Sequence, residues 1–370
     1  MYLSKFQATG LRNLKPIDLE LSSDLNIIEG VNAAGKSSFL EGVCFILSGR
    51  SFRTSKSERL ISHDINLLSL YAELGTSDRL GMSVSRGKDS RKIKLNGESV
   101  NNLSETVSLF PVQVLSPESY HLIDSGPSQR RKFIDWLLFH VEHNYIKEWK
   151  EFNKVLKHRN AYLRSLRGGL GKLDPIQIEA WDAKFNEISK VIHTKRKRAV
   201  DYTAIELVSI LEKLDFSFPK KLSLEYVSGF GEDGLVRKLE YNLSNDVRKG
   251  ITTAGPHKAD IKIKFQNMDV KDTLSRGQKK ILINALHLTQ TNLLKSLSDK
   301  DSLFIIDDYS SELDGVNQSK LVRALQGQQN VQVLLSCLDS KVLKPVIKEY
   351  NSVSMFHVEH GEISKVNLSN

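Results

Sequence analysis

The chain has 370 residues, of which 40% are hydrophobic and 26% charged, a composition typical of a folded protein with one large core or a few smaller ones. It contains no uncharged apolar run of about 18 residues, which argues against a membrane span. The two cysteines, Cys44 and Cys337, lack metal-ligand spacing and predict a reducing, cytoplasmic environment without disulfides.

The net charge of +9 is concentrated in one segment. Residues 128–200 hold 17 Lys and Arg against 8 Asp and Glu, so they carry +9, while the rest of the chain holds 36 residues of each sign. Localised positive charge favours a polyanionic partner, because phosphate neutralisation dominates nucleic-acid affinity. A solvated helix surface would give the same count, so charge alone leaves both interpretations open.

The first 30 residues predict strands, with alternation in YLSKFQATGL and IDLELS and an apolar run in LNIIEG. A helix pattern follows, with Phe39, Val43 and Ile46 on one side. Further strands are predicted by the alternation at 67–74, 80–84 and 91–95, and LNGES (95–99) predicts a hairpin turn.

From Gln129 the hydrophobic period becomes helical, with apolar residues three or four apart as far as Leu156. Glycines at 168–171 interrupt this pattern, and Asp174 with Pro175 predicts the capped start of a second helix. The segment therefore predicts a short helical hairpin, with KRKR (195–198) on its second helix.

Strand patterns return at 222–227 and 261–265. They are followed by the turn TLSRGQKKI (273–281), the buried strands SLFIIDD (302–308) and NVQVLLS (330–336), and a hairpin at FHVEHGEI (356–363). Helical material is thus inserted between two halves of an α/β domain.

The segment GVNAAGKSS (30–38) fits the pattern G-x-x-x-x-G-K-[ST] directly after an apolar strand and before a helix. In such a loop backbone N–H groups and the helix N-terminus face a phosphate, while Lys36 reaches the β- and γ-phosphates and Ser37 binds Mg²⁺. The predicted nucleotide-binding residues here are Gly30, Val31, Asn32, Ala33, Ala34, Gly35, Lys36, Ser37 and Ser38.

LFIIDD predicts the second half of the site. Asp307, at the end of the strand, is a hard oxygen ligand for Mg²⁺, and the adjacent Asp308 is placed to orient or deprotonate an attacking water. We therefore predict Asp308 and Lys36 as catalytic residues. The alternative is an ordinary strand end with two solvated acids.

Lys36 and Asp307 are 271 residues apart and no N-K-x-D motif occurs, which disfavours a compact kinase or GTPase. Ser275, Gly277 and Gln278 form an S-x-G-Q turn before a helix, a second anion-binding helix N-terminus. Together with Asp307-Asp308 and Glu312-Leu313-Asp314, this order looks like an ABC-type ATPase.

The chain resembles the bacterial RecF family over essentially its whole length. Six blocks match in order: GVNAAGKSSFLEG, SFRT with LI, LSPESYHLIDSGPSQRRKFIDW, TAGPHKADIKIK, TLSRGQKK and FIIDDYSSELD. The resemblance implies an ABC-type ATPase head with mixed sheets and helices and an inserted α-helical lobe containing a short helical hairpin. Its expected lobes are 1–112 with 300–370, and 113–299 with the signature motif and a helical insert at about 128–215.

The resemblance also implies a function: an ATP-dependent DNA-binding protein of recombinational repair and replication restart. It would bind single-stranded and duplex DNA at gaps, dimerise around ATP and Mg²⁺, and act with RecO and RecR near the nucleoid. Ser275 would contact the γ-phosphate held by Lys36 of the other subunit, Asp314 would lie across the same seam, and Gln113 would serve as the sensor glutamine.

Two departures from the wider ABC pattern suggest a weak, DNA-stimulated ATPase that acts as a switch. No histidine follows the strand VQVLLS, where Ser336 or Cys337 stands instead, and Asp308 replaces the longer glutamate of transporters.

Candidate DNA contacts come from the basic segment: Arg130, Arg131, Lys195, Arg196, Lys197 and Arg198. Arg130 and Arg131 could equally pair with carboxylates inside the fold. His257 is interpreted as a packing residue rather than a metal ligand. Arg12 faces either the nucleotide or solvent, and the run Arg50, Arg53, Lys56 and Arg59 faces either DNA or solvent.

Two other functions compete with this reading. A transporter ATPase subunit would require a coupling surface and fast turnover, for which the basic insert gives no reason. An SMC-like organiser would require arms of hundreds of heptad residues, far longer than the hairpin here.

Overall fold

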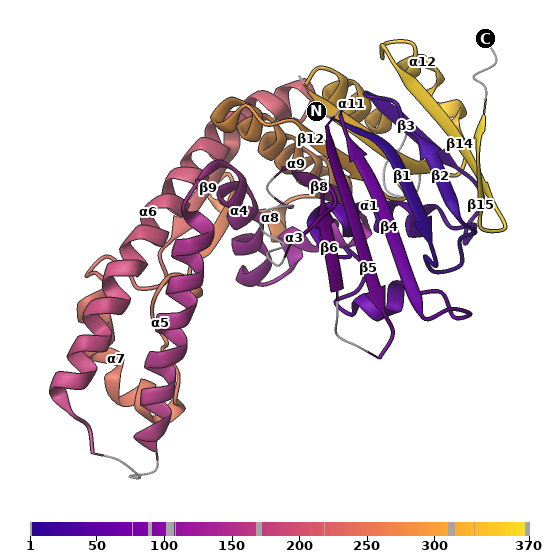
Figure 1. The fold of residues 1–370 in the computed structure, drawn as a ribbon. Helices are drawn as coiled ribbons and strands as arrows, with labels where there is room; N and C mark the ends of the chain where they lie inside the picture. Colours follow the sequence, from indigo (N-terminus) through magenta and orange to yellow (C-terminus); the bar gives the residue numbers. More distant parts are fainter. Residues whose placement is uncertain are drawn as a thin grey trace. The chain divides into compact units, whose positions relative to one another are not determined.

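The computed structural model describes residues 2–75, 77–87, 91–100, 107, 109–167, 172–217, 219–309, 315–328 and 330–366 (Figure 1). The chain forms two compact units. The first contains Met1–His121, Ser209–Ser217 and Ser275–Asn370, and the second contains Leu122–Val208 and Phe218–Leu274. Residues 113–121, 209–217 and 275–299, which are expected in the second lobe, belong to the first unit in this division.

An antiparallel sheet of six strands forms one layer of the first unit. In spatial order its strands are β2 (Ile17–Glu20), β1 (Leu3–Thr9), β4 (Leu67–Leu74), β5 (Asp78–Ser85), β6 (Arg91–Leu95) and β7 (Glu98–Ser99). Asn96 and Gly97 both have positive φ, at 53° and 89°, which confirms the predicted hairpin turn between β6 and β7.

The second sheet of this unit places the predicted nucleotide-binding segments side by side. Its order is β15 (Glu362–Val366), β14 (Val353–Glu359), β3 (Leu25–Glu29), β13 (Val331–Cys337), β12 (Ser302–Ile306) and β8 (Val112–Leu115). All neighbours pair in parallel except β14 and β15. Parallel strands buried on both faces read as continuous apolar runs, which is why LNII, LFII and VLL lack alternation.

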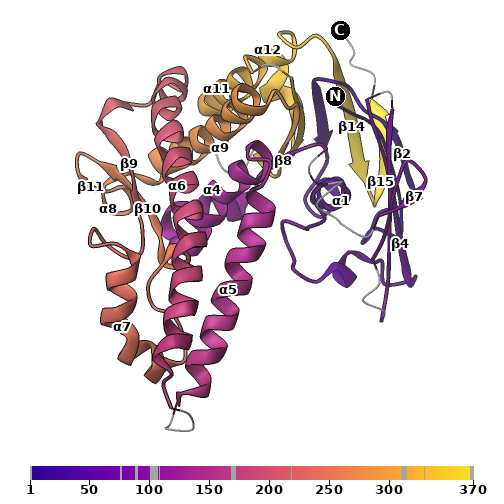
Figure 2. The same cartoon turned by 60° about the vertical axis from the view of Figure 1, so that its left-hand side comes forward.

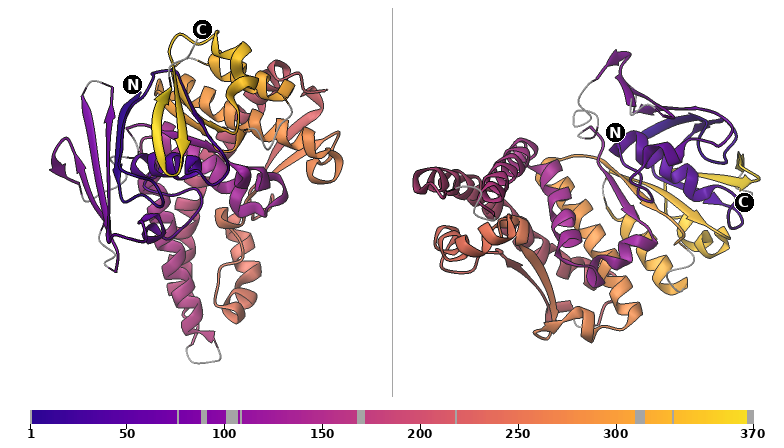
Figure 3. Two further views of the ribbon diagram at one scale, coloured as in Figure 1. Left: turned by 90° about the vertical axis from the view of Figure 1, so that its right-hand side faces the viewer. Right: turned by 90° about the horizontal axis from the view of Figure 1, so that it is seen from below.

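Helix α1 (Lys36–Ser48) contacts β4 and β5 of the first sheet and β8 and β13 of the second (Figure 3). Its side chains Phe39, Val43 and Phe45 are buried between the two layers, and Phe39 meets Phe6 edge-to-face. Helix α9 (Arg276–Ser298) packs against β8 of the second sheet, and helix α11 (Gly315–Gln326) packs against β13. Shorter elements are η1 (Ser57–Leu60), η2 (Pro117–Tyr120), η6 (Ser340–Leu343) and α12 (Lys344–Ile347).

The second unit is built around a helical hairpin, as predicted (Figure 2). It comprises α4 (Pro127–Val141), α5 (Tyr145–Ser165), α6 (Pro175–Lys213, of which the last turn belongs to the first unit) and α7 (Leu235–Lys249). A small sheet of β11 (Met268–Asp269), β10 (Asp260–Phe265) and β9 (Leu222–Val227) packs beside α4. Short helices are α3 (His121–Asp124), η4 (Pro219–Lys221), η5 (Pro256–Lys258) and α8 (Val270–Thr273).

The hairpin starts and stops largely where the sequence indicates. The Asp174 carboxylate accepts a hydrogen bond of 3.0 Å from the Ile176 N–H, which confirms the predicted cap of α6. The helix predicted from Gln129 instead breaks into α4 and α5 at Glu142, whose backbone is extended. The Glu142 carboxylate pairs with Lys195 and Arg198 of α6.

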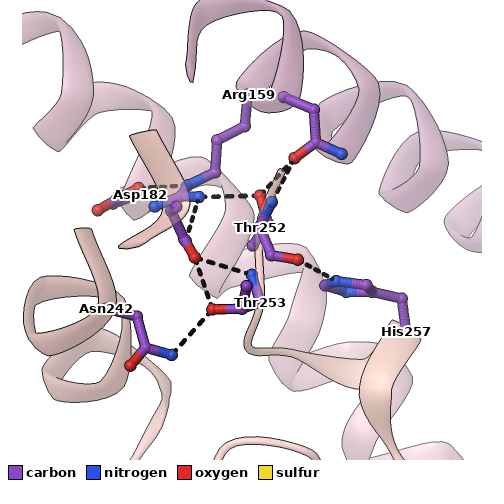
Figure 4. A network of polar contacts seen from close by, with 8 residues as sticks. Arg159, Asp182, Asn242, Thr252, Thr253 and His257 are labelled. Atoms are coloured by element: carbon purple, nitrogen blue, oxygen red, sulfur yellow. Dashed lines mark hydrogen bonds and ion pairs between the residues drawn. The ribbon is translucent and has the colours of Figure 1, made fainter. Parts of the chain in front are cut away.

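A buried polar network joins α5, α6 and α7 to the loop at 252–257 (Figure 4). Arg159 on α5 is fully buried and donates to Asp182, Asp246 and Thr252. His257 Nε2 lies 2.9 Å from the Thr252 carbonyl oxygen, and burial lowers the pKa of His257 to about 4. The packing role predicted for His257 is therefore confirmed, and the described residues contain no cluster suited to a metal ion.

Among the described helices, none combines the length and apolar character that crossing a membrane requires.

Candidate nucleotide-binding site

The loop between β3 and α1 has a backbone that only small residues permit. Gly35 has φ of 123°, and a Cβ there would lie 2.4 Å from Leu14 Cδ2. A Cβ on Gly30 would lie 2.4 Å from the Val358 carbonyl oxygen of β14. Both glycines of the motif are thus required by close approaches within the first unit. Ala33, with φ of 64°, forms the exposed crown of the loop with Val31 and Asn32, while Ala34 and Ser38 are buried.

Lys36 begins α1 and turns its side chain back over the loop. Its Nζ donates to the carbonyl oxygens of Gly30 at 2.7 Å and Val31 at 2.9 Å. Burial lowers the pKa of this amine, and the carboxylates of Asp308 and Asp307 oppose that shift. The ammonium is therefore positioned inside the loop, where a phosphate would be its strongest counter-charge.

Ser37 and Asp307 meet although 270 positions separate them. The Ser37 hydroxyl donates to Asp307 Oδ1 at 2.8 Å, because the parallel order β3-β13-β12 brings the carboxyl ends of β3 and β12 to the same edge. Burial raises the pKa of Asp307, and the hydrogen bonds from Ser37 and Ser336 oppose the shift. A hydroxyl and a carboxylate oxygen at this distance fit the hard oxygen donors that Mg²⁺ prefers.

Ser336, on the intervening strand β13, holds both aspartates. Its hydroxyl donates to Asp307 Oδ1 at 2.9 Å and accepts from the Asp308 N–H at 2.9 Å. Asp308 takes a left-handed backbone with φ of 58°, which turns the chain sharply after β12. Ser336 stands where the sequence lacks a histidine, and its positioning role could be recognised only once β13 was placed beside β12.

Two arginines near the loop differ in their placement. Arg12 forms a bidentate pair with the fully buried Glu41, at 2.6 and 2.9 Å, so its guanidinium is committed to α1. Arg53, from the basic run after α1, carries a positive charge that opposes the burial-driven rise in the pKa of Asp307. With Arg50 and Arg91 it lines a cleft of about 420 Å³. From the sequence, Arg53 was predicted to face either DNA or solvent, and it was not associated with the aspartates.

The signature turn is a complete helix cap. Ser275 Oγ accepts from the Gln278 N–H at 3.3 Å, and Gln278 Oε1 accepts from the Ser275 N–H at 2.9 Å. Ser275 and Gly277 are exposed, and a Cβ on Gly277 would meet nothing described within 4 Å. The fold of the described chain does not require glycine at 277, which leaves room for a ligand to approach the backbone.

Gln113, the predicted sensor glutamine, contacts a neighbouring helix. Gln113 is buried in β8, and its Nε2 donates to Gln290 Oε1 of α9 at 2.6 Å. Asp314, with Glu312 and Leu313, lies outside the described residues.

The predicted DNA contacts differ in their exposure and in their partners. Arg196 is only 3% exposed and pairs with Asp135 through two bonds of 2.8 Å, so its prediction as a DNA contact is wrong because its guanidinium is closed off from solvent. Arg130 takes the alternative structural role, with a bidentate pair to Asp260 at 2.8 and 2.9 Å.

The other four are more accessible. Arg131 donates to the Ala259 carbonyl oxygen, and Lys195 contacts Glu148 and Glu142. Lys197 and Arg198 are both exposed, and Arg198 pairs with Glu142.

Comparisons with known proteins bear on the whole chain. A family model described as "RecF/RecN/SMC N terminal domain" matches residues 2–364. The chain is 34% identical to the DNA replication and repair protein RecF of Stutzerimonas stutzeri (strain A1501), covering 99% of this chain and 98% of that relative. It is 35% identical to the RecF protein of Pseudoalteromonas translucida (strain TAC 125), covering 98% and 99%.

Solved structures are similar as well. One is described as the recombination mediator protein RecF with ATP in the RecFOR pathway, with a TM-score of 0.86, 25% identity and coverage of 99% of this chain and 98% of that chain. An Smc head bound to the C-terminal winged-helix domain of ScpA matches with a TM-score of 0.58 and 14% identity over 100% and 98%, a likeness of fold alone.

Proposed function

The chain belongs to the RecF family of DNA replication and repair proteins, and we propose that it is an ATP-dependent DNA-binding protein of recombinational repair and replication restart. ATP would close two copies into a dimer on DNA at gaps, and slow, DNA-stimulated hydrolysis would reopen it. RecO and RecR are its proposed partners, in line with the RecFOR pathway in which a similar structure was described.

One observation carries the nucleotide-dependent part of the proposal: the contact of Ser37 with Asp307. A loop that cradles phosphate and a strand that ends in adjacent acids are brought together from opposite ends of the chain. This pairing is what a P-loop ATPase needs to hold a nucleotide and its metal ion in one place.

Four residues would bind the metal ion and the phosphates and activate the attacking water. Ser37 and Asp307 would hold Mg²⁺, which neutralises developing charge on the phosphates when bound. Lys36 would exchange the carbonyl oxygens of Gly30 and Val31 for phosphate oxygens. Asp308, held through its N–H by Ser336, would orient the attacking water and accept its proton.

Ser275 supports a site shared by two copies. In its capping box the hydroxyl oxygen only accepts a hydrogen bond, so the hydroxyl hydrogen can still donate. An exposed donor at a helix N-terminus suits a terminal phosphate. We propose that Ser275 of one copy meets the γ-phosphate held by Lys36 of the other, with Gly277 allowing close approach.

Sedimentation velocity tests this proposal directly. ATP with Mg²⁺ should convert monomer to dimer in the unmodified chain, while Lys36→Met and Ser275→Arg should remain monomeric and Asp308→Asn should accumulate as dimer. Ser77→Arg, in an exposed turn of the first unit, is the matched control and should dimerise normally. Identical monomers with and without ATP would refute the shared site.

The ATPase rate with and without duplex DNA separates this function from a transporter subunit. Stimulation that disappears at high salt supports contacts to phosphates, because those contacts release counterions. Fast hydrolysis that ignores DNA would favour the transporter interpretation.

A further inference from the structure

The outer face of α5 carries a row of five exposed cations, which we call the α5 stripe: Lys147, Lys150, Lys154, Lys157 and Arg164. We propose that the α5 stripe is a docking surface for the sugar-phosphate backbone of double-stranded nucleic acid. This inference rests on the proposed function and specifies which surface would carry it.

The spacing of these residues places them on one side of the helix. At 3.6 residues per turn the five fall within an arc of about 100°, opposite the arc of the buried side chains. Those buried side chains, which face α6 and α7, are Tyr145, Phe152, Val155, Arg159 and Leu163. From Lys147 to Arg164 the row extends about 26 Å along the helix axis, roughly seven base-pair steps of a duplex.

The stripe is uncompensated within the described chain. None of its five side chains forms an ion pair with a described residue, and neither acid of α5 falls within its arc. The acids of α5 lie elsewhere on the helix, where Glu148 contacts Lys195 and Glu151 lies 3.9 Å from Lys184.

Other cations of the same segment are occupied inside the fold. Arg130 pairs with Asp260, Arg159 with Asp182 and Asp246, and Arg196 with Asp135. Although the net charge of +9 is a property of residues 128–200, the structure displays much of its unpaired part on α5.

This arrangement works against the helix itself. Lys147–Lys150, Lys150–Lys154 and Lys154–Lys157 are like-charged neighbours three or four residues apart, and each such pair destabilises a helix. Alternating acids would give equal solubility without this repulsion. A row of like charges is matched by a row of opposite charges, and a nucleic-acid backbone offers one.

The test compares two charge-matched double variants of the full chain with ATP and Mg²⁺. Lys154→Gln/Lys157→Gln removes the centre of the stripe, while Lys184→Gln/Lys190→Gln removes two exposed lysines of α6. Binding of a fluorescent duplex is measured by anisotropy at several salt concentrations. We expect the α5 variant to lose at least about tenfold in affinity at about 0.1 M salt, and its log–log salt slope to fall by about 1.8, because each phosphate contact contributes about 0.9.

The α6 variant should bind nearly as the unmodified chain does, and Lys154→Arg/Lys157→Arg should retain affinity because it keeps the charge. Equal losses in the α5 and α6 variants, or an unchanged slope in the α5 variant, would overturn the stripe. So would a loss confined to phosphatidylserine vesicles, which would assign the stripe to a membrane surface. If the unmodified chain bound ATP but no DNA, the proposed function would fail instead.

Discussion

Replacing Arg159 with methionine should lower the free energy of unfolding of the second unit far more than any surface substitution does. The guanidinium is fully buried and contacts Asp182 at 2.6 Å, Asp246 at 3.2 Å and the Thr252 hydroxyl at 2.8 Å. Methionine keeps most of the stem's apolar packing but removes every one of these donors.

The magnitude follows from what remains. Asp246 is fully buried, and without Arg159 its carboxylate keeps only the hydrogen bonds from Thr253, at 3.1 and 2.5 Å. Breaking a buried ion pair from one side typically costs about 3–5 kcal/mol, because the remaining charge is uncompensated. Asp182 retains some contact with solvent, with 16% of its side chain exposed, so it should contribute the smaller part.

Tryptophan fluorescence is a selective assay for this prediction. The three tryptophans of the chain, Trp136, Trp149 and Trp181, all belong to the second unit, so urea unfolding followed by their emission reports on that unit. The loss should shrink as the pH falls, since protonation neutralises the carboxylates that are left without their cation.

A double variant isolates the buried charge as the cause. Asp246→Asn added to Arg159→Met should recover part of the lost free energy of unfolding, because it removes the uncompensated charge. A loss below about 1 kcal/mol for Arg159→Met, or no recovery in the double variant, would refute the reasoning.

Three further predictions concern the nucleotide site of the first unit. Gly35→Ala should cost about 1–3 kcal/mol, because φ is 123° and the Cβ would lie 2.4 Å from Leu14 Cδ2, and it should abolish the thermal shift on adding ATP. Ser336→Ala should cost about 1–2 kcal/mol, seen by calorimetry, and weaken Mg²⁺-dependent ATP binding, since the Asp308 N–H loses its acceptor. Asp307→Asn should raise the melting temperature at pH 7 while eliminating the ATP shift. Burial raises the pKa of Asp307 above 3.8, so ionisation of this carboxylate lowers the stability of the fold as the pH rises through the raised pKa. The gain in melting temperature of Asp307→Asn should therefore vanish at a pH below 3.8, where the carboxyl is protonated in the unmodified chain as well.

Much of the fold could be predicted from local patterns. The hairpin turn at Asn96-Gly97, the capped start of α6 and the strand–loop–helix of Lys36 each depend on residues adjacent in sequence. Helix α7 was not predicted, although it is strongly amphipathic. The break between α4 and α5 was also missed, since the apolar spacing continues through it and the ion pairs of Glu142 involve residues more than fifty positions away.

The nucleotide site was predictable in its types of residue but not in its connections. The motif assigned Ser37 and Asp307 separate roles, yet only the strand order shows that their oxygens meet. The prediction of a DNA contact at Arg196 in the basic segment was wrong for a different reason. KRKR is prominent in the sequence, but a helix turns such a run in every direction, and Arg196 points inward to Asp135. The α5 stripe is spread over 18 positions and is visible only at helical spacing.

The end of β13 explains why this site should turn over slowly. Ser336 is fully buried and its hydroxyl is shared between the two aspartates, so it has no hydrogen left to offer a phosphate. The next residue, Cys337, is buried as well, and burial raises the pKa of its thiol to about 12, which keeps it protonated at neutral pH. Neither side chain can therefore donate or accept a proton as the histidine of many ABC ATPases does at this strand end. Proton acceptance would fall to Asp308, whose side chain is one methylene shorter than a glutamate's. We therefore propose that this site cleaves ATP slowly, as expected of a site in which ATP first joins two copies of the chain and its hydrolysis later releases them.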